Sequence, residues 1–240
     1  MNTKLSISIV VPVWNEEGSL PQLIERIHSA VAKYAEYEII AVDDHSNDTS
    51  VSILKSYETS YPIKTFTKRG ARGKAQSITE GVEHATYPIL AMIDADLQYP
   101  PEAIVPMAQM IDRNEADVIV GNRKQQETSK VRKFIHTTCR VAIGKVLHGF
   151  DVDIQSGLKV FKKEVAQHIK LNPSPWAFDL EFLVAARSAG FRIGNYDILF
   201  AKRTIGDSKI NLAQGAWQIG VSAVKLKLDQ LFASHSHKQI

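Results

Sequence analysis

Three features of this 240-residue chain predict an α/β fold in which helices flank a mostly parallel sheet. Short apolar runs alternate five times with segments of helical periodicity, which is the order of a parallel sheet wrapped by helices. The run after Pro88 is apolar throughout, as expected of a strand buried on both faces. Three of the runs end in acidic residues and one in an arginine, so charge enters where the strands leave the sheet.

The first half of the chain divides into strand–helix units. Ser19 is the expected N-cap of the first helix, whose apolar residues between Leu20 and Val31 repeat at helical spacing. A short helix runs through Leu54, and apolar positions at 78–85 and 104–111 mark two more. The predicted strands are residues 7–13, 38–42, 63–67, the apolar run that ends at Asp94, and 117–120.

The second half is less regular. Residues 124–130 read as a polar loop, and residues 131–146 as a helix rich in lysine and arginine. A loop at 151–157, a strand at 158–161, a helix near 179–189 and a strand around 193–201 follow. No internal repeat or low-complexity linker divides the chain. We therefore expect one domain at 1–211, with halves at 1–123 and 124–211, and a C-terminal helix and tail at 212–240.

The last helix carries apolar residues at alternating four- and three-residue steps, namely Trp217, Val221, Val224, Leu228 and Leu231. This seam could pack on the domain, pair with another subunit, or lie on a membrane surface with lysines beside it. Packing onto the same domain is the interpretation that we favour. The oligomeric state stays open.

Composition narrows the function class. The formal net charge of +3 is too small to indicate a nucleic-acid partner. The single cysteine, Cys139, excludes an intramolecular disulfide and a zinc site built mainly from thiolates, and it fits a reducing compartment. No apolar stretch reaches the roughly 18 residues of a membrane span, and the first residues lack the features of a signal peptide. These features predict a cytoplasmic protein.

Asp94 and Asp96 stand one residue apart directly after the buried run, and Gln98 follows. In open α/β sheets, ligands bind at the carboxyl edge of the strands. A pair of hard oxygen ligands at that edge suits Mg²⁺ or Mn²⁺, which in turn can hold a diphosphate. A solvated turn is the alternative. Because acids and Arg123 at other strand ends converge on the same edge, we predict a divalent-metal site there.

Six motifs run in order through nearly the whole chain. They are VPVWNE at 11–16, VDDHSNDT at 42–49, DADLQ at 94–98, GNR at 121–123, SGLK at 156–159, and Arg203 with GDSK at 206–209. With these motifs the chain resembles the inverting glycosyltransferases of family 2 with the GT-A fold. Within that family it is most similar to the dolichyl-phosphate mannose synthases and related polyprenyl-phosphate glycosyltransferases. Leu158-Lys159 departs from the pattern, where an aromatic residue followed by arginine is common.

The resemblance implies a role for each matching residue. The first half would bind a nucleotide-sugar donor, GDP-mannose or a UDP-hexose, and the second half the acceptor. The implied donor-binding residues are Pro12, Trp14, Glu16, Val42, Asp44, Asp94, Ala95, Asp96, Arg123, Arg203 and Lys209. The implied metal ligands are Asp94, Asp96 and Gln98, and the implied acceptor-phosphate residues are Arg123, Arg132 and Ser156. The implied catalytic residues are Asp96, Arg123 and Arg203.

The class of acceptor depends on whether the reaction needs a general base. A sugar hydroxyl needs a general base as it attacks, whereas a lipid phosphate is already ionised and needs positive charge to hold it. Asp151, Asp153, Asp179 and Glu181 are available as bases. Residues 153–157 and 203–209 resemble the phosphate-acceptor subgroup, so we favour a polyprenyl phosphate. A sugar-hydroxyl acceptor, and a nucleotide-sugar-binding subunit without turnover, are the alternatives.

A lipid acceptor implies contact with a membrane, directly or through a membrane-anchoring partner. The helices around 131–146 and 217–231 carry basic residues that could face anionic headgroups. We therefore expect a cytoplasmic protein that works at the cytoplasmic face of a membrane.

Overall fold

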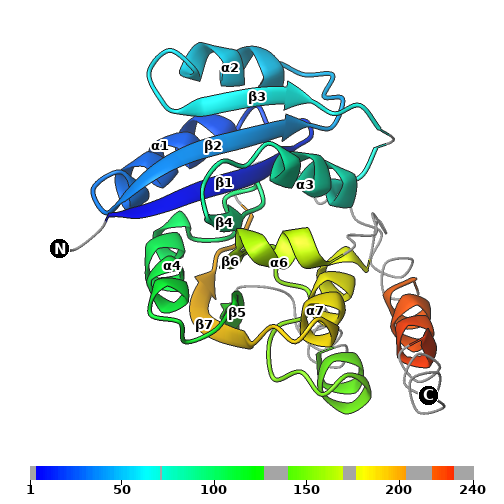
Figure 1. Ribbon diagram of the computed structural model, residues 1–240. Helices are drawn as coiled ribbons and strands as arrows, with labels where there is room; N and C mark the ends of the chain where they lie inside the picture. The colour runs from blue at the N-terminus through cyan, green and yellow to red at the C-terminus, as the bar shows by residue number, and fades with distance from the viewer. Residues whose placement is uncertain (1–3, 71, 127–139, 170–176, 204–217, 230–240) are drawn as a thin grey trace.

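The computed structural model describes residues 4–70, 72–126, 140–169, 177–203 and 218–229. They form a seven-stranded mixed sheet flanked by helices (Figure 1), so the predicted fold class is confirmed. The strands are β1 (Leu5–Val13), β2 (Ala35–Asp43), β3 (Ile63–Thr67), β4 (Ile89–Met92), β5 (Val118–Gln126), β6 (Lys159–Lys162) and β7 (Ile193–Phe200).

The sheet has the strand order β3-β2-β1-β4-β6-β5-β7. Strands β1 to β4 pair in parallel, as do β5 and β7. Strand β6 lies between β4 and β5 and is antiparallel to both. Because two antiparallel steps restore the direction, β4 and β5 still point the same way, and their carboxyl ends share one edge. The sequence pattern predicted this strand at 158–161 but did not reveal its position between β4 and β5.

Helices cover both faces of the sheet (Figure 1). Along β1, Ile9 and Val11 pack on the face that carries α1 (Leu20–Val31) and α4 (Ile104–Asp112). Val10 points to the opposite face, which carries α3 (Lys74–Glu83) and α7 (Phe178–Ser188). The strand is therefore buried on both sides. The other helical segments are α2 (Ser50–Tyr57), the 3₁₀ turn η1 (Pro101–Ala103), the π-helical η2 (Arg140–Leu147), α6 (Lys163–His168), and residues 218–229.

Ser19 is the N-cap residue of α1, as predicted, but its side chain makes no capping hydrogen bond. Its hydroxyl donates to the backbone oxygen of Glu16 at 3.1 Å and bonds to the Glu16 carboxylate at 3.0 Å, and it caps no amide of α1. Ser19 already has helical backbone angles, φ −99° and ψ −29°, so its side chain does not face the first free amides. The backbone oxygen of Glu16 instead accepts the amides of Ser19 and Leu20, both at 3.0 Å.

The first three residues of the polar loop predicted at 124–130 belong to a strand instead. Residues 124–126 still belong to β5, because the pairing with β7 continues to Gln126 opposite Phe200. Residues 127–130 lie outside the described residues, as does most of the helix predicted at 131–146. Its described end is the π-helical η2.

The C-terminal helix packs with a different face from the predicted one. Ile219 and Ala223 are buried, and the backbone oxygen of Ala223 lies 3.0 Å from His148 Nε2. Val221, Val224 and Leu228 are 51%, 52% and 47% exposed, so their expected packing on the domain is wrong. The buried face has its own four-residue spacing, offset by two positions from the apolar seam. Trp217 and Leu231 lie outside the described residues.

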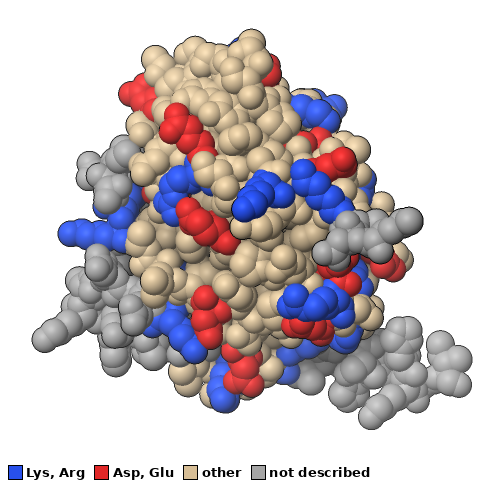
Figure 2. Space-filling model, turned by 90° about the vertical axis from the view of Figure 1, so that its left-hand side faces the viewer, with Lys and Arg blue, Asp and Glu red and all other residues tan. Residues whose placement is uncertain are grey.

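Charged side chains of both signs are interspersed on the face seen in Figure 2. Neither sign forms a continuous patch on that face. Among the helices that the structure describes, none has the length and apolar character needed to cross a membrane.

Candidate active site

Four strands bring the predicted site residues to one edge of the sheet. Strands β1 and β2 end in register, with Val13 opposite Asp43, and β4 runs parallel to β1. The residues that arrive at this edge are Trp14 after β1, Asp44 after β2, Asp94 and Asp96 after β4, and Arg123 in β5. The convergence predicted from the sequence is therefore present.

Strained backbone marks the same edge. Asn15, His45 and Leu97 have positive φ angles of 52°, 59° and 61°, and each lies in the loop that follows β1, β2 or β4. Side chains other than glycine rarely adopt this left-handed region, and such residues concentrate at functional sites. Asp96 and Gln98 are the residues directly before and after the left-handed Leu97.

Asp96 is largely buried and is contacted from a distant part of the chain. Arg203 Nη1 lies 3.5 Å from Asp96 Oδ2, and Arg203 Nη2 lies 2.8 Å from Glu16 Oε1. Burial, followed by the charge of Asp94, raises the pKa of Asp96 to about 6, although the backbone amide of Gln98 and Arg203 oppose the shift. The charge of Asp94 is thus close enough to disfavour the ionisation of Asp96.

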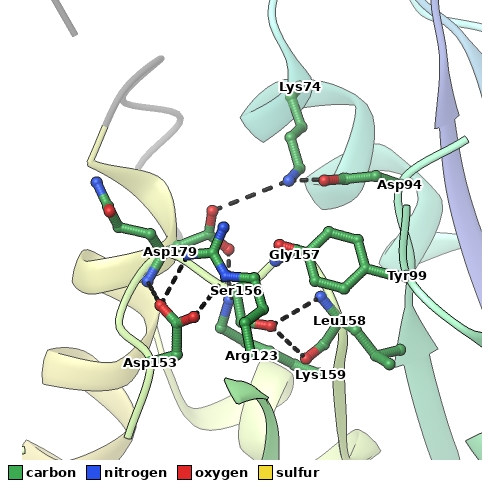
Figure 3. Close-up of polar contacts among 11 residues, drawn as sticks. Lys74, Asp94, Tyr99, Arg123, Asp153, Ser156, Gly157, Leu158, Lys159 and Asp179 are labelled. Carbon is green, nitrogen blue, oxygen red and sulfur yellow. Dashed lines mark hydrogen bonds and ion pairs between the residues drawn. The ribbon is translucent and has the colours of Figure 1, made fainter. Parts of the chain in front are cut away.

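Asp94 lies between a lysine and a glycine (Figure 3). Lys74 Nζ is 2.6 Å from Asp94 Oδ1. On the other side, a Cβ atom added to Gly157 would lie 2.2 Å from Asp94 Oδ2. The amide of Gly157 donates to the Tyr99 hydroxyl at 2.8 Å, which holds the glycine in place. Only glycine therefore allows the carboxylate this position.

The side chain of Gln98 is tied to the end of β7. Its Nε2 donates to the backbone oxygen of Ala201 at 3.1 Å, and the amide of Ala201 donates to the backbone oxygen of Gln98 at 3.0 Å. The amide oxygen is then the side-chain atom that Gln98 can offer a metal.

Asp94 and Asp96 fit a divalent cation by their chemistry. They supply the hard oxygens that Mg²⁺ and Mn²⁺ prefer. Burial is the largest cause of the raised pKa of Asp96 and the charge of Asp94 is the next, and a bound cation would favour the ionised form against both. Within the described ranges, no group of three or more His, Cys, Asp or Glu side chains could hold a metal ion. The pair therefore suits a cation whose remaining ligands come from a substrate.

Arg72 and Asp44 lie beside Trp14, one of the predicted nucleoside-binding residues. The guanidinium of Arg72 lies 5.0 Å from the centre of the Trp14 ring, and Arg72 Nη2 donates to the backbone oxygen of His45 at 2.9 Å. Asp44 accepts the amide of Gly73 at 2.9 Å and pairs with the buried Lys68. Asp44 thereby holds Lys68 and Gly73 in place. These two residues stand before and after Arg72 in the sequence, and Arg72 lies over the Trp14 ring.

The other described residues predicted to bind the donor are buried or half-buried in the sheet and its loops. The side chain of Val42 packs in the core against α3, and Ala95 is also buried. Pro12 is half-buried in β1 opposite Val42. Arg132 and Lys209 lie outside the described residues.

Arg123 forms a two-pronged ion pair with Asp153. Its Nε and Nη2 donate to the two carboxylate oxygens at 2.5 and 2.9 Å, and its guanidinium lies 5.2 Å from the centre of the Phe200 ring. Burial opposes the ionisation of Asp153, but Arg123 outweighs it and holds the pKa of that carboxyl below its usual value. Arg123 is therefore a fixed, largely buried positive charge.

The hydroxyl of Ser156 is used by its own turn. It donates to the backbone oxygen of Leu158 at 3.2 Å and accepts the amide of the same residue at 3.3 Å, and the residue is fully buried. This position gives Ser156 a part in shaping the turn before β6 and keeps its hydroxyl away from solvent.

Asp179 enters the site from α7. One carboxylate oxygen pairs with the buried Lys159, which also donates to the backbone oxygen of Ser156, and the other lies 3.9 Å from Lys74 Nζ (Figure 3). Burial opposes the ionisation of Asp179, but Lys159 and then Lys74 outweigh it, so the pKa of Asp179 is below its usual value. Asp179 is consequently a weak proton acceptor.

The sequence-based assignment missed Arg72, Lys74 and Lys159. A usable signal existed for the first two, because residues 68–74 combine glycines with four basic residues directly after a strand, an arrangement that favours anions. Nothing in the sequence marks Lys159 as buried, since a lysine in a short strand reads as a solvent-facing residue.

The chain matches the model of the family described as Glycosyl transferase family 2 over residues 8–169. The dolichol-phosphate mannosyltransferase of Pyrococcus furiosus is 28% identical over 216 residues, covering 86% of this chain and 59% of that protein. The undecaprenyl-phosphate 4-deoxy-4-formamido-L-arabinose transferase of Proteus mirabilis is 30% identical over 207 residues, covering 85% and 62%. The chain thus spans about three-fifths of the length of these relatives.

The crystal structure of glucosyl-3-phosphoglycerate synthase from Mycobacterium tuberculosis with Mn²⁺, UDP-glucose and phosphoglyceric acid has the same architecture. It matches with a TM-score of 0.72 and 15% identity over 93% of this chain and 80% of that one. At this identity the likeness shows the fold.

Proposed function

The chain belongs to glycosyl transferase family 2, and from that premise we propose that it transfers a sugar from a nucleotide-sugar donor to a polyprenyl phosphate. The names of the two relatives, a dolichol-phosphate and an undecaprenyl-phosphate transferase, support this acceptor class. The donor lies over residues 1–123 and the acceptor over residues 124–211 in this proposal.

The state of three of the four candidate bases, Asp151, Asp153 and Asp179, bears on the choice of acceptor. Asp153 is paired with Arg123, Asp179 with Lys159, and Asp151 Oδ1 lies 3.0 Å from Lys145 Nζ. A carboxylate held by a cation accepts a proton poorly, and the lowered pKa of Asp153 and of Asp179 reflects this. A hydroxyl acceptor requires a base, whereas an ionised phosphate does not. The two buried pairs, at Asp153 and Asp179, therefore favour the phosphate, whereas the pair of Lys145 with Asp151 is solvent-exposed and adds little to the argument.

For the donor nucleoside, Trp14 offers an aromatic face for the base, and Glu16 and Asp44 offer oxygens to base amides or ribose hydroxyls. Val42 and Pro12 support this surface from β2 and β1. The sequence and the fold leave GDP-mannose and UDP-hexoses as equal candidates.

For the donor diphosphate, Asp94 and Asp96, with the amide oxygen of Gln98, would hold Mg²⁺ or Mn²⁺. The related fold that carries Mn²⁺ with UDP-glucose supports a divalent cation. Such a cation would neutralise the charge that grows on the departing diphosphate. Arg203, which contacts both Glu16 and Asp96, adds positive charge at the same point.

In the transfer step, an oxygen of the ionised acceptor phosphate attacks the anomeric carbon of the sugar. The bond from that carbon to the donor diphosphate breaks, and the nucleoside diphosphate leaves with the electron pair, so the anomeric configuration inverts. Arg123 supplies fixed positive charge for the acceptor phosphate, and Arg132 and Lys209 belong to the same proposed set of basic residues.

The acceptor would be met at a membrane surface. Val221, Val224 and Leu228 on the C-terminal helix, and Val146 at the end of η2, are among the large apolar residues that the structure leaves exposed. Lys225 lies between these valines and Leu228, and Lys145 precedes Val146. Exposed apolar side chains beside lysines suit the interface of an anionic membrane. We therefore include peripheral binding at the cytoplasmic face in the proposal.

The experiment that tests the proposal is a transfer assay in detergent. The protein receives radiolabelled GDP-mannose, UDP-glucose or other UDP-sugars, together with Mn²⁺ or Mg²⁺ and either undecaprenyl phosphate or undecaprenol. We expect label in the organic phase with the phosphate and one of the donors, and none with the alcohol. Label on the alcohol, or on an added glycan, would point to a hydroxyl acceptor. Tight nucleotide binding without transfer from any donor would point to a non-catalytic subunit.

A further inference from the structure

We propose that Lys74 is an exchangeable counter-ion: it leaves Asp94 for Asp179 when a divalent cation takes the Asp94 carboxylate. Cation binding at the donor side would then be coupled to α7 in the second half of the chain. The inference rests on the proposed metal site at Asp94 and Asp96, and it assigns Lys74 a role in the binding of the metal.

The ammonium group of Lys74 pairs with a carboxylate oxygen of Asp94 that a divalent cation would bind. Its Nζ lies 2.6 Å from Asp94 Oδ1, and the two side chains are 34% and 26% exposed. The other oxygen, Asp94 Oδ2, lies against Gly157, where an added Cβ would come within 2.2 Å. Lys74 therefore holds one of the two Asp94 oxygens, and a divalent cation cannot share that oxygen with the ammonium without strong repulsion.

Asp179 provides the second position for the ammonium. Its Oδ2 lies 3.9 Å from Lys74 Nζ, slightly beyond hydrogen-bond distance, while its Oδ1 is taken by Lys159. Figure 3 shows Lys74 between the two carboxylates, with Asp94 on the donor side and Asp179 on α7. A shift of the ammonium by about 1 Å would turn this long contact into a hydrogen bond.

Lysine is suited to this movement. Its ammonium is a compact charge on a flexible four-carbon stem, so it can change partner while the backbone stays in place. Lys74 is the first residue of α3, and Gly73 before it is fixed by Asp44, so the stem starts from a fixed point. Asp179 in turn is held by Lys159, which binds the turn at Ser156. The exchange therefore connects Asp94 to the turn before β6.

The test is a measurement of Mn²⁺ affinity by electron paramagnetic resonance on the full chain, with and without UDP or GDP. For Lys74→Met we expect Mn²⁺ alone to bind about five- to tenfold more tightly than in the wild type, because the competing ammonium is gone. Lys64→Met is the matched control. It removes a half-exposed lysine that pairs with Glu38 away from the site, and it should change the affinity less than about twofold.

A double-mutant cycle separates exchange from the general effect of charge. Asp179→Asn removes the second position, and we expect it to weaken Mn²⁺ binding at least about threefold more with Lys74 present than in the Lys74→Met background. Equal effects in the two backgrounds would overturn the exchange. Because Asp179→Asn leaves Lys159 without its carboxylate, that variant could fail to fold. A crystal structure of the wild type with Mn²⁺ then decides, and we expect Lys74 Nζ within about 3 Å of Asp179.

Two further results are distinguishable. If Lys74→Met leaves the affinity unchanged, or Lys74 stays on Asp94 in the Mn²⁺ structure, the exchange is refuted. The metal site survives that result provided that Asp96→Asn abolishes binding. If the wild type binds no Mn²⁺ with or without nucleotide, the metal site and the exchange are both refuted.

Discussion

Asp117 and the Asp94–Asp96 pair are acidic sites at opposite edges of the same sheet, and they differ in how fully they are compensated. Asp117, at the start of β5, receives Lys162 Nζ at 2.6 Å, Arg192 Nε at 3.1 Å and the backbone amide of Arg192 at 2.9 Å. Burial opposes its ionisation, but these donors hold its pKa well below the usual range. For Asp96 the balance is reversed, and its pKa is raised.

The difference separates a structural acid from a ligand-binding one. Asp117 has as many donors as it can use, and it joins the start of β5 to β6 and to the start of β7. Asp94 and Asp96 lie close together beside a turn with left-handed backbone at Leu97. Each of the two has a cationic contact, Lys74 for Asp94 and Arg203 for Asp96, yet the pKa of Asp96 stays raised. That a divalent cation binds this pair is a hypothesis that substitutions can test.

The largest expected effect is that of Asp96→Asn on sugar transfer. The change removes a proposed metal ligand and the charge that Arg203 contacts, so we expect turnover to fall by about a thousandfold or more. Thermal unfolding should occur at the same temperature or higher, because asparagine carries no buried charge beside Asp94. Transfer assays and calorimetry on one preparation check both statements. Turnover within about tenfold of the wild type would remove Asp96 from the site.

Gly157→Ala should also reduce transfer, by about a hundredfold. The new methyl group would lie 2.2 Å from Asp94 Oδ2, so the carboxylate must move away. A misplacement of about 1 Å in a positioned active site costs about a hundredfold in rate. Gly220→Ala, where an added Cβ meets nothing within 4 Å, is the control and should transfer sugar at the wild-type rate. Equal activity of the two variants would mean that the position of Asp94 does not matter.

Asp117→Asn should give the opposite result to Asp96→Asn. We expect a loss of about 2 kcal/mol in the free energy of unfolding at pH 7, because Lys162 and Arg192 lose a charged partner but remain able to reach water. Turnover per folded molecule should stay within about twofold, since Asp117 lies at the far edge from the proposed site. Urea unfolding and transfer assays measure the two quantities. A large loss of turnover in a stable variant would contradict the assignment of Asp117 as structural.

The smallest effect is the pH dependence of that same stability difference. A carboxyl whose folded-state pKa is lowered stabilises the protein above its unfolded-state value of 3.8, and this contribution is lost as the pH falls further. The gap between wild type and Asp117→Asn should therefore be largest at about pH 6 to 7, begin to shrink as the pH falls below 3.8, and disappear only when the pH falls through the strongly lowered folded-state pKa of Asp117. Urea titrations across this range follow it. A gap that stays the same size between about pH 6 and about pH 2 would mean that packing, and not charge, is responsible.

Much of the first half follows from local pattern. The apolar run before Asp94 could be recognised as a strand buried on both faces, because few other structures accommodate so many apolar residues between prolines. The motifs around Trp14, Asp44 and Asp96 fixed the family, and the GT-A fold followed from it. In the second half, β6 was found as a strand, but its place between β4 and β5 could not be read, since pairing partners distant in sequence leave no periodic signal.

By itself the sequence determined which residues are acidic, which end a strand, and hence that an oxygen-rich edge exists. Only the tertiary structure decided how each of those acids is compensated. Asp153 meets Arg123 and Asp179 meets Lys159 across 30 and 20 residues of chain, and Arg203 reaches Glu16 across 187. Charge compensation depends on distance in space and on burial, and neither is encoded by the spacing of residues along the chain.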